Sequence, residues 1–248
     1  MKIVGIIPAR YASVRFPAKP LAPLAGKAMV LHVVEAGRAA RSLDRVAVAT
    51  DDERIADAVR QAGAEVVLTS RDCASGTDRL AEAARSLAAD AYVNIQGDEP
   101  MMTGENIDRA VETLLRFPER EIATLSVAMP SRQAADPNVV KVVAAEDGRA
   151  LYFSRSPIPF FRNGEPAHRK HLGIYAYRAA TLARLAGLAP SPLEKAESLE
   201  QLRWLEAGYA IWVGEAASDS VGVDTPEDLA RVEEWMRKAE TMRKEAAS

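Results

Sequence analysis

Residues 3–8 have the sequence IVGIIP, a β-branched run that ends at a proline. Such a run predicts a short, buried strand. Three more apolar runs follow in the first hundred residues, at 46–50, 65–68 and 91–95, and helical patterns separate them at 28–40, 53–62 and 78–88. Buried strands that alternate with helices predict a parallel sheet with helices on both faces.

The second half of the chain has a different pattern. Strands are expected at 122–129, 171–177 and 210–213, and the runs 139–145 and 150–154 flank Asp147-Gly148, a hairpin signal. Helices are expected at 199–207 and after the cap Thr225, where Pro226 takes the first helical position. We therefore predict a Rossmann-like α/β fold, with a mixed, mostly parallel sheet and a small antiparallel β extension. The 248 residues are interpreted as one domain in three parts, 1–130, 131–220 and 221–248.

Composition excludes several classes of protein. Apolar residues make up 48% and charged residues 27%, so a full core is available, and the net charge of −3 argues against a general nucleic-acid binder. The single cysteine, Cys73, allows no intrachain disulfide and fits a reducing compartment. Because no apolar run approaches the ~20 residues that span a bilayer, we expect a soluble, cytoplasmic protein without a membrane partner.

The loop after the first strand carries the first candidate site. It contains Arg10, Arg15 and Lys19 with no acid among them. Ligands of open α/β sheets bind at the carboxyl ends of the strands, and Arg and Lys suit phosphate oxygens. A solvated basic loop is the alternative, but the placement after strand one favours phosphate binding.

Three further places offer polar groups. Residues 75–79, SGTDR, precede a helix, where free N–H groups could hold an anion, although taken alone an N-cap is the better interpretation. Asp98, after the fourth strand, is a candidate Mg²⁺ ligand or a simple turn acid, with the two evenly balanced. Asp224, one residue before the helix cap, could be a second metal carboxylate. His168 and His171 flank two cations, which suits an acidic substrate without establishing one.

At these places the sequence resembles the 3-deoxy-manno-octulosonate cytidylyltransferases, or CMP-Kdo synthetases, from Ile3 to about Val232. The blocks that carry the resemblance are 8–13 with Arg15 and Lys19, 75–79, 94–100, 153–155, 170–178, 197–203 and 223–229. Three residues depart from the family's pattern: Ala18 stands where many relatives have Gly, Ala28 where many have Pro, and Cys73 where His is common.

The resemblance implies a fold of the nucleotide-diphospho-sugar transferase type and a set of site residues. For the nucleotide these are Ala9, Arg10, Arg15, Lys19, Ser75, Gly76, Arg79 and Gln96, with Arg10 and Lys19 also catalytic on the phosphates. For the acidic sugar they are Gln96, Arg155, His171, Tyr175, Glu200 and Gln201. The catalytic metal ligands are Asp98 and Asp224, for Mg²⁺.

The implied reaction couples CMP from CTP to 3-deoxy-manno-octulosonate with release of pyrophosphate, the activation step for lipopolysaccharide biosynthesis, in a homodimer. Arg155 and His171 would attract the carboxylate of the sugar. An amino-substituted octulosonate, a sialic-type acid, or a non-catalytic nucleotide-binding protein are the alternatives. A nicotinamide-dependent enzyme would need a glycine fingerprint that the sequence lacks.

Overall fold

The computed structural model describes residues 1–248 except 13–15, 74, 165–166 and 247–248. The chain forms two compact units, each assembled from separate stretches. The first unit comprises Met1–Ile3, Ala89–Asn94 and Glu105–Asp219, and the second comprises Val4–Ala88, Ile95–Gly104 and Ser220–Ser248. The predicted division into three parts along the chain stays a prediction.

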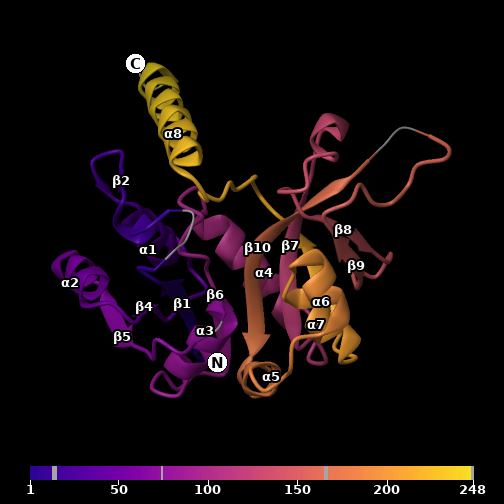
Figure 1. The fold of residues 1–248 in the computed structure, drawn as a ribbon, viewed down its shortest axis with the longest axis horizontal. Coiled ribbons are helices and arrows are strands. Elements are labelled where there is room, and N and C mark those ends of the chain that lie inside the picture. The colour runs from indigo at the N-terminus through magenta and orange to yellow at the C-terminus, as the bar shows by residue number, and fades with distance from the viewer. Residues whose placement is uncertain (13–15, 74, 165–166, 247–248) are drawn as a thin grey trace. The chain divides into compact units, whose positions relative to one another are not determined.

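The second unit is built on three parallel strands. β4 (Arg45–Thr50) pairs with β1 (Ile3–Ala9) on one side and with β5 (Glu65–Leu68) on the other (Figure 1). Helices α1 (Met29–Ala39), α2 (Glu53–Gln61) and α3 (Gly76–Ala84) contact β4. Ile6, Ile7 and Val48 are fully buried, as the β-branched sequence predicts.

Side-chain caps fix where helices of this unit begin. Asp52 accepts a hydrogen bond from Arg54 N at the start of α2, and Ser75 forms a reciprocal capping box with Asp78 at the start of α3. Gly63, with φ of 68°, follows α2 in the left-handed region that glycine favours. A short 3₁₀ helix, η1 (Lys19–Leu21), and a two-strand hairpin, β2 (Pro23–Leu24) with β3 (Lys27–Ala28), fill the stretch before α1.

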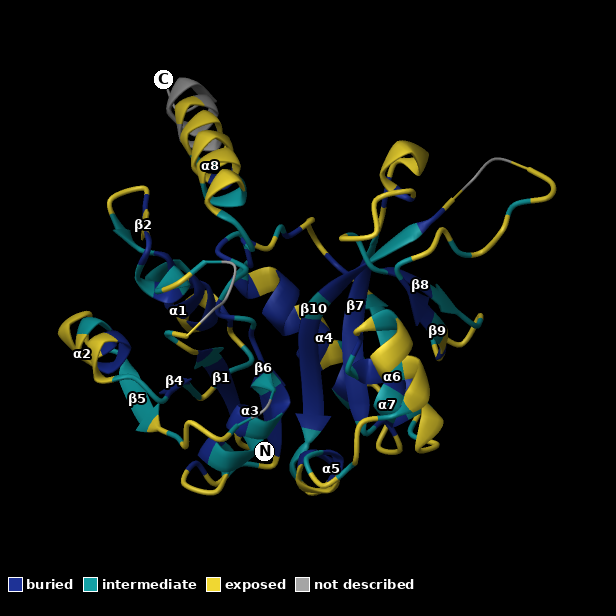
Figure 2. Cartoon of the chain, in the orientation of Figure 1, coloured by how far each residue is buried: buried dark blue, intermediate teal, exposed yellow. Residues whose placement is uncertain are grey.

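The terminal helix α8 (Pro226–Ala246) belongs to the same unit. Its residues Leu229, Val232 and Met236 recur at helical spacing and pack on a core that includes Leu24 and Met29. Most of the other residues of α8 whose burial the structure describes are exposed (Figure 2). The apolar stripe therefore explains why this helix returns to the N-terminal half of the chain.

The first unit holds a mixed sheet. β10 (Arg169–Arg178) pairs antiparallel with β6 (Ala91–Asn94), β7 (Ile122–Ala128) and β8 (Lys141–Ala144), while β11 (Ile211–Glu215) runs parallel to β7. β9 (Ala150–Ser154) completes the predicted hairpin with β8. The other elements are α4 (Gly104–Leu115), η2 (Ser131–Gln133), α5 (Ala179–Leu185), α6 (Pro192–Glu197) and α7 (Gln201–Glu206).

A bulge in β10 shapes the aromatic interior of this unit. Leu172 pairs with Leu125 but Tyr175 pairs with Thr124, so Gly173 and Ile174 are extra residues on the β10 side. The bulge shortens the distance between His171 and Tyr175 along the strand, and their ring centroids lie 5.4 Å apart. In a regular strand, residues four apart would be separated by about 13 Å.

The predicted α/β fold class is confirmed, including the antiparallel β8–β9 hairpin. The strands come within about two residues of their predicted bounds, whereas α3 begins at Gly76 rather than at 78 and ends at Ala84 rather than at 88. The helices α4, α5 and α6 were not predicted. Within the described part of the chain, no helix combines the length and apolarity that a membrane span requires.

Candidate active site

A cavity of about 330 Å³ lies in the second unit, at the carboxyl ends of its strands. Cations come from the loop after β1, carboxylates from two distant loops, and small polar groups from the start of α3. The lining residues are Pro8, Ala9, Arg10, Lys19, Pro20, Cys73, Ser75, Gly76, Arg79, Gln96, Gly97, Asp98 and Asp224. Most of the residues predicted for the nucleotide and both residues predicted for the metal therefore line one cavity.

Gly97 allows two backbone segments of this cavity to meet. A Cβ on this residue would lie 2.6 Å from the carbonyl oxygen of Pro8, a distance that no side chain tolerates. The close contact sets Gln96 and Asp98 beside the end of β1. A glycine at position 97 is thus needed for packing as well as for a turn.

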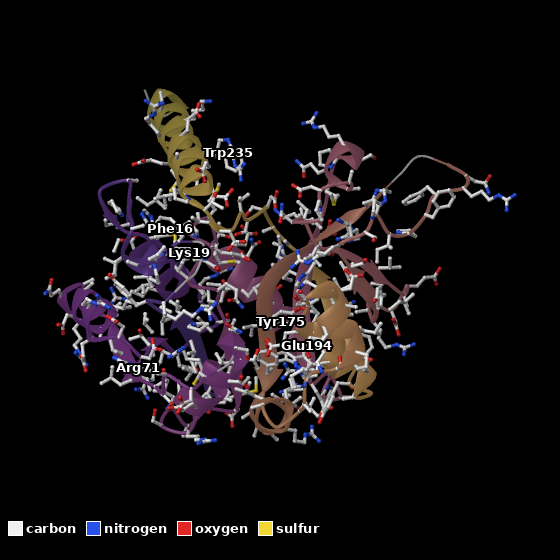
Figure 3. All side chains as sticks on the ribbon, viewed as in Figure 1. Phe16, Lys19, Arg71, Tyr175, Glu194 and Trp235 are labelled. Carbon is white, nitrogen blue, oxygen red and sulfur yellow. The ribbon has the colours of Figure 1, made fainter. Side chains whose placement is uncertain are left out.

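Lys19 joins the two candidate metal ligands. Its ammonium Nζ lies 2.8 Å from Asp98 Oδ2 and 3.4 Å from Asp224 Oδ1, and it donates to the carbonyl oxygen of Val223 at 2.8 Å. The Lys19 side chain, labelled in Figure 3, is 12% exposed, whereas the two aspartates are 38% and 49% exposed. An ammonium group and two accessible carboxylates therefore converge in the cavity.

The backbone explains how residues 126 positions apart come together. Val223 N donates to the carbonyl oxygen of Asp98 at 2.8 Å, which holds the segment before α8 against the loop after β6. Asp224 follows directly, and its own N–H donates to Asp228 in the first turn of α8. The sequence predicted both carboxylates, and the structure brings them to the same place.

The residues present fit a magnesium ion that arrives with a nucleotide. Mg²⁺ usually takes one or two carboxylates and completes its shell with phosphate oxygens and water. Asp98 and Asp224 supply two such carboxylates, both reaching the same ammonium group. Among the described residues, no cluster of three or more acids, histidines or cysteines could hold a metal by itself. The donor set therefore suits a metal shared with a phosphate ligand.

Arg10 and Ala9 also line the cavity, Arg10 with an exposed side chain and Ala9 buried in β1. Arg15, the third predicted cation, lies outside the described residues. Lys19 and Arg10 therefore carry the positive charge among the described residues of the opening loop.

Another part of the cavity lining is formed by the start of α3 and the residues before it. Cys73, Ser75 and Gly76 belong to it. Ser75 is the N-cap of α3, so the capping interpretation is correct, and the residue lines the cavity as well. The Cys73 thiol donates to Glu82 Oε2 at 3.1 Å, and burial, aided by that carboxylate, raises the thiol's pKa to about 11.

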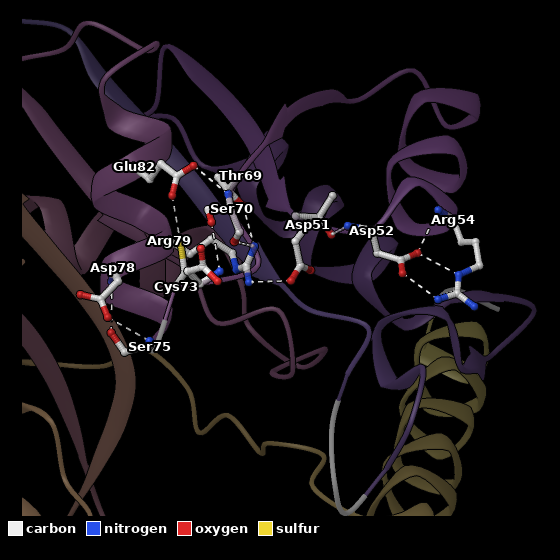
Figure 4. Close-up of polar contacts among 12 residues, drawn as sticks. Asp51, Asp52, Arg54, Thr69, Ser70, Cys73, Ser75, Asp78, Arg79 and Glu82 are labelled. Carbon is white, nitrogen blue, oxygen red and sulfur yellow. Dashed lines mark hydrogen bonds and ion pairs between the residues drawn. The ribbon is translucent and has the colours of Figure 1, made fainter.

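Arg79 lines the cavity, and its guanidinium group is bonded to other protein side chains as well. Its side chain is 4% exposed, and its guanidinium lies 3.1 Å from Asp51 Oδ2 and 2.5 Å from Thr69 Oγ1 (Figure 4). Neither partner was among the predicted site residues. Asp51 does follow β4 directly at the carboxyl edge of the sheet, a signal that could have identified it.

The residues predicted for the sugar, apart from Gln96, lie in the first unit. Arg155 is held by the backbone: Nε donates to the carbonyl oxygen of Glu197 at 2.7 Å and a terminal nitrogen donates to that of Pro137 at 2.8 Å. Lys141, fully buried, donates to the carbonyl oxygens of Asp136, Val139 and Arg155. Lys141 and Glu197 were not predicted, because their role depends on contacts between segments distant in sequence.

His171 is a neutral group in this setting. Complete burial lowers the pKa of its imidazole to about 3. Thr124 Oγ1 lies 2.9 Å from His171 Nε2 and donates its single proton to the carbonyl oxygen of Ile174 at 2.7 Å, so Nε2 carries the ring proton. Because burial keeps the ring uncharged, His171 has no charge of its own with which to attract a carboxylate, and its part in binding the sugar stays a prediction.

Tyr175 continues the same cluster. Its ring lies 5.0 Å from that of Trp204 in an edge-on contact, and burial, with the nearby Tyr177 and Glu200, raises the pKa of its hydroxyl well above the usual value. Glu200 precedes α7 and Gln201, buried, begins it. His171, Tyr175 and Glu200 are thus brought together around one aromatic cluster.

Comparison with known proteins decides the family. The sequence model of the cytidylyltransferases matches residues 4–213. A 3-deoxy-manno-octulosonate cytidylyltransferase from Syntrophobacter fumaroxidans is 55% identical over 241 residues, which cover 94% of this chain and 96% of the relative. This chain belongs to the 3-deoxy-manno-octulosonate cytidylyltransferase family. The family assigned from the sequence motifs is confirmed.

Solved structures agree with this cytidylyltransferase assignment. A CMP:2-keto-3-deoxy-manno-octonic acid synthetase complexed with CTP is 44% identical, with a TM-score of 0.93 over 96% of this chain and 100% of that one. A cytidylyltransferase from Leptospira borgpetersenii is 18% identical, with a TM-score of 0.62 over 92% of this chain and 83% of that one, and shares the fold.

Proposed function

We propose that this protein transfers CMP from CTP to 3-deoxy-manno-octulosonate, giving CMP-Kdo and pyrophosphate. The observation that carries the proposal is the convergence of Lys19 with Asp98 and Asp224 in a cavity that Arg10 also lines. Relatives that match nearly the whole chain have names stating this cytidylyltransferase activity, and the structural neighbour at 44% identity is described as complexed with CTP.

The chemistry needs no covalent enzyme intermediate. The anomeric hydroxyl of the sugar forms a bond to the α-phosphorus of CTP, the bond from that phosphorus to the bridging oxygen breaks, pyrophosphate leaves, and the hydroxyl proton is released. Positioning and charge neutralisation can carry such a transfer. Arg10 and Lys19, which come from the loop after β1 and line the cavity, would neutralise the triphosphate.

Magnesium dependence belongs to this proposal. Asp98 and Asp224 would hold the ion, which when bound would lower the pKa of the sugar hydroxyl and neutralise phosphate charge. Lys19 forms ion pairs with both carboxylates, so its ammonium group already lies beside the place where the phosphates of CTP would bind.

For the sugar acid we propose Gln96 together with Arg155, His171, Tyr175, Glu200 and Gln201. Arg155 would supply positive charge, while neutral His171, with Nε2–H bonded to Thr124, leaves Nδ1 able to accept a hydrogen bond from a hydroxyl. We further propose that the protein acts in the cytoplasm as a homodimer and supplies lipopolysaccharide biosynthesis with its activated sugar.

Pyrophosphate release tests the proposal. Protein with CTP, Mg²⁺ and the octulosonate is expected to release pyrophosphate, while omission of the sugar or of Mg²⁺ should abolish release. An amino-substituted octulosonate and a sialic acid in parallel identify the preferred acid. Absence of release with every acid, together with measurable CTP binding, would point instead to a non-catalytic nucleotide-binding protein. Light scattering reports the oligomeric state.

A further inference from the structure

Arg79 connects three segments of the second unit around one wall of the cavity. Its guanidinium pairs with Asp51 at the end of β4, at 3.1 Å, and donates to Thr69 Oγ1 and to the carbonyl oxygen of Ser70 after β5, at 2.5 and 3.4 Å (Figure 4). The two side chains of the ion pair are 4% and 15% exposed. Both terminal nitrogens of Arg79 are thus engaged by protein groups.

Other residues on α3 fasten the same segment. Glu82, one turn after Arg79, accepts from Ser70 N at 2.7 Å and from the Cys73 thiol at 3.1 Å. Ser75 and Asp78 close a reciprocal capping box at the start of the helix. Residues spaced three or four apart share a helix face, so one face of α3 holds Ser70 and Cys73 as well as the cap Ser75.

The start of α3 and the residues before it contribute uncharged groups to the cavity lining. These are Cys73, Ser75 and Gly76, whereas the cations Arg10 and Lys19 come from the loop after β1. Arg79 lines the cavity as well, but its guanidinium is paired with Asp51. Phosphates belong beside the cations, so the base and ribose of a nucleotide are left for the uncharged wall. A wall of short side chains and backbone groups can distinguish bases only when its donors and acceptors are fixed in place.

On these grounds, and resting on the proposed cytidylyl transfer, we propose that Arg79 is a positioning residue for nucleotide selection. It acts through Asp51 and through the backbone of residues 69–70, which orient the wall that meets the base. The planar guanidinium is suited to this role because it bonds a carboxylate and a hydroxyl in fixed directions, which an ammonium group does not.

The test compares CTP with UTP, two nucleotides that differ only on the base. In Arg79→Met the ratio of kcat/KM for CTP to that for UTP is expected to fall about tenfold or more, mainly through a higher KM for CTP. Arg79→Lys should recover little of the ratio. Asp51→Asn should lower the ratio as well. In the double variant the ratio should fall by less than the product of the two single decreases, because both substitutions break the same ion pair.

Arg60→Met is the matched control, since Arg60 forms exposed ion pairs with Glu53 and Asp57 on α2, outside the cavity lining. Its ratio should stay at the wild-type value. If Arg79→Met does not fold, Thr69→Val, which removes one acceptor and keeps the ion pair, decides the question. An unchanged ratio in folded variants, with both nucleotides affected equally, would overturn the positioning role. Wild-type protein that releases no pyrophosphate would instead reject the proposed function.

Discussion

Lys19 Nζ lies 2.8 Å from Asp98 Oδ2, and the same nitrogen reaches Asp224 Oδ1 at 3.4 Å. An ammonium group therefore lies between two carboxylates that fit a divalent cation. A metal that enters this space has to displace Lys19, whereas a triphosphate offers the lysine new partners. Under the proposed function, the arrangement would link metal binding to nucleotide binding.

Lys19→Met is expected to strengthen metal binding by the nucleotide-free protein. Loss of the competing ammonium leaves two carboxylates that repel each other, so affinity for Mn²⁺ should rise about fivefold, the amount that a partly exposed ion pair provides. Electron paramagnetic resonance of free Mn²⁺ measures this without turnover. Lys27→Met, which breaks the ion pair of Lys27 with Glu35 outside the cavity lining, should leave the affinity unchanged. Equal affinity in wild type and Lys19→Met would contradict the competition.

Asp98→Asn is expected to remove turnover while the fold persists. The substitution keeps the shape of a side chain that is 38% exposed but removes the charge that a cation requires, so pyrophosphate release should fall at least about a hundredfold. Asp57→Asn, on the exposed surface of α2, is the control. Circular dichroism and thermal unfolding establish that both variants are folded. Near-normal release by Asp98→Asn would remove this carboxylate from the reaction.

The sequence predicted local features well because they depend on neighbouring residues. Strands β1 and β5 follow from their own β-branched runs, and the cap Ser75 from its place before a helix. The helix α4 was missed although Ile107, Ala110, Val111 and Leu114, all buried, recur at helical spacing. The spacing of these apolar residues is a helix signal that the sequence itself contains.

The site was predictable in part. The family motifs indicated Lys19, Asp98 and Asp224, but only the structure shows that Lys19 bridges the two aspartates. The pairing of Arg79 with Asp51, 28 positions away, depends on how β4, β5 and α3 pack, and no local pattern encodes it. The charge of His171 likewise depends on complete burial, which neighbouring cations in the sequence do not reveal.

Cys73 is expected to resist alkylation although it lines the cavity. Its pKa is raised from 9.0 to about 11, mainly by burial and then by Glu82, so the thiolate is about a hundredfold scarcer than for an ordinary thiol near pH 8. Iodoacetamide labelling followed by mass spectrometry should show a correspondingly slow rate. Glu82→Gln should speed labelling, and CTP should slow it in that variant. Labelling of the wild type at the rate of a free thiol would refute the assigned environment.

The neutral His171 should make the protein less stable as the pH falls. Its folded pKa of about 3 lies below the ordinary 6.5, so between these values the unfolded chain binds a proton that the folded chain does not. As the pH falls below 6.5, this group alone should lower the free energy of unfolding by up to about 1.4 kcal/mol per pH unit. Urea titrations at pH 4.5 to 7 should show a shallower decrease for His171→Gln, which can still donate to Thr124. The same slope in both proteins would mean that His171 titrates normally.

Ala18→Gly is expected to stabilise the protein. Ala18, where many relatives have glycine, has φ of 58° and ψ of 18° at the start of η1, directly before Lys19. The left-handed region destabilises a residue with a Cβ by about 1–2 kcal/mol, and glycine avoids that cost. The greater conformational entropy of glycine in the unfolded chain offsets part of the resulting stabilisation. The free energy of unfolding should therefore rise by up to about 1 kcal/mol. Ala22→Gly, at a φ of −57° in the same segment, should instead lower it, because alanine is unstrained there. If Ala18→Gly destabilises the protein as much as Ala22→Gly does, the left-handed conformation beside Lys19 is not the one that the folded protein adopts.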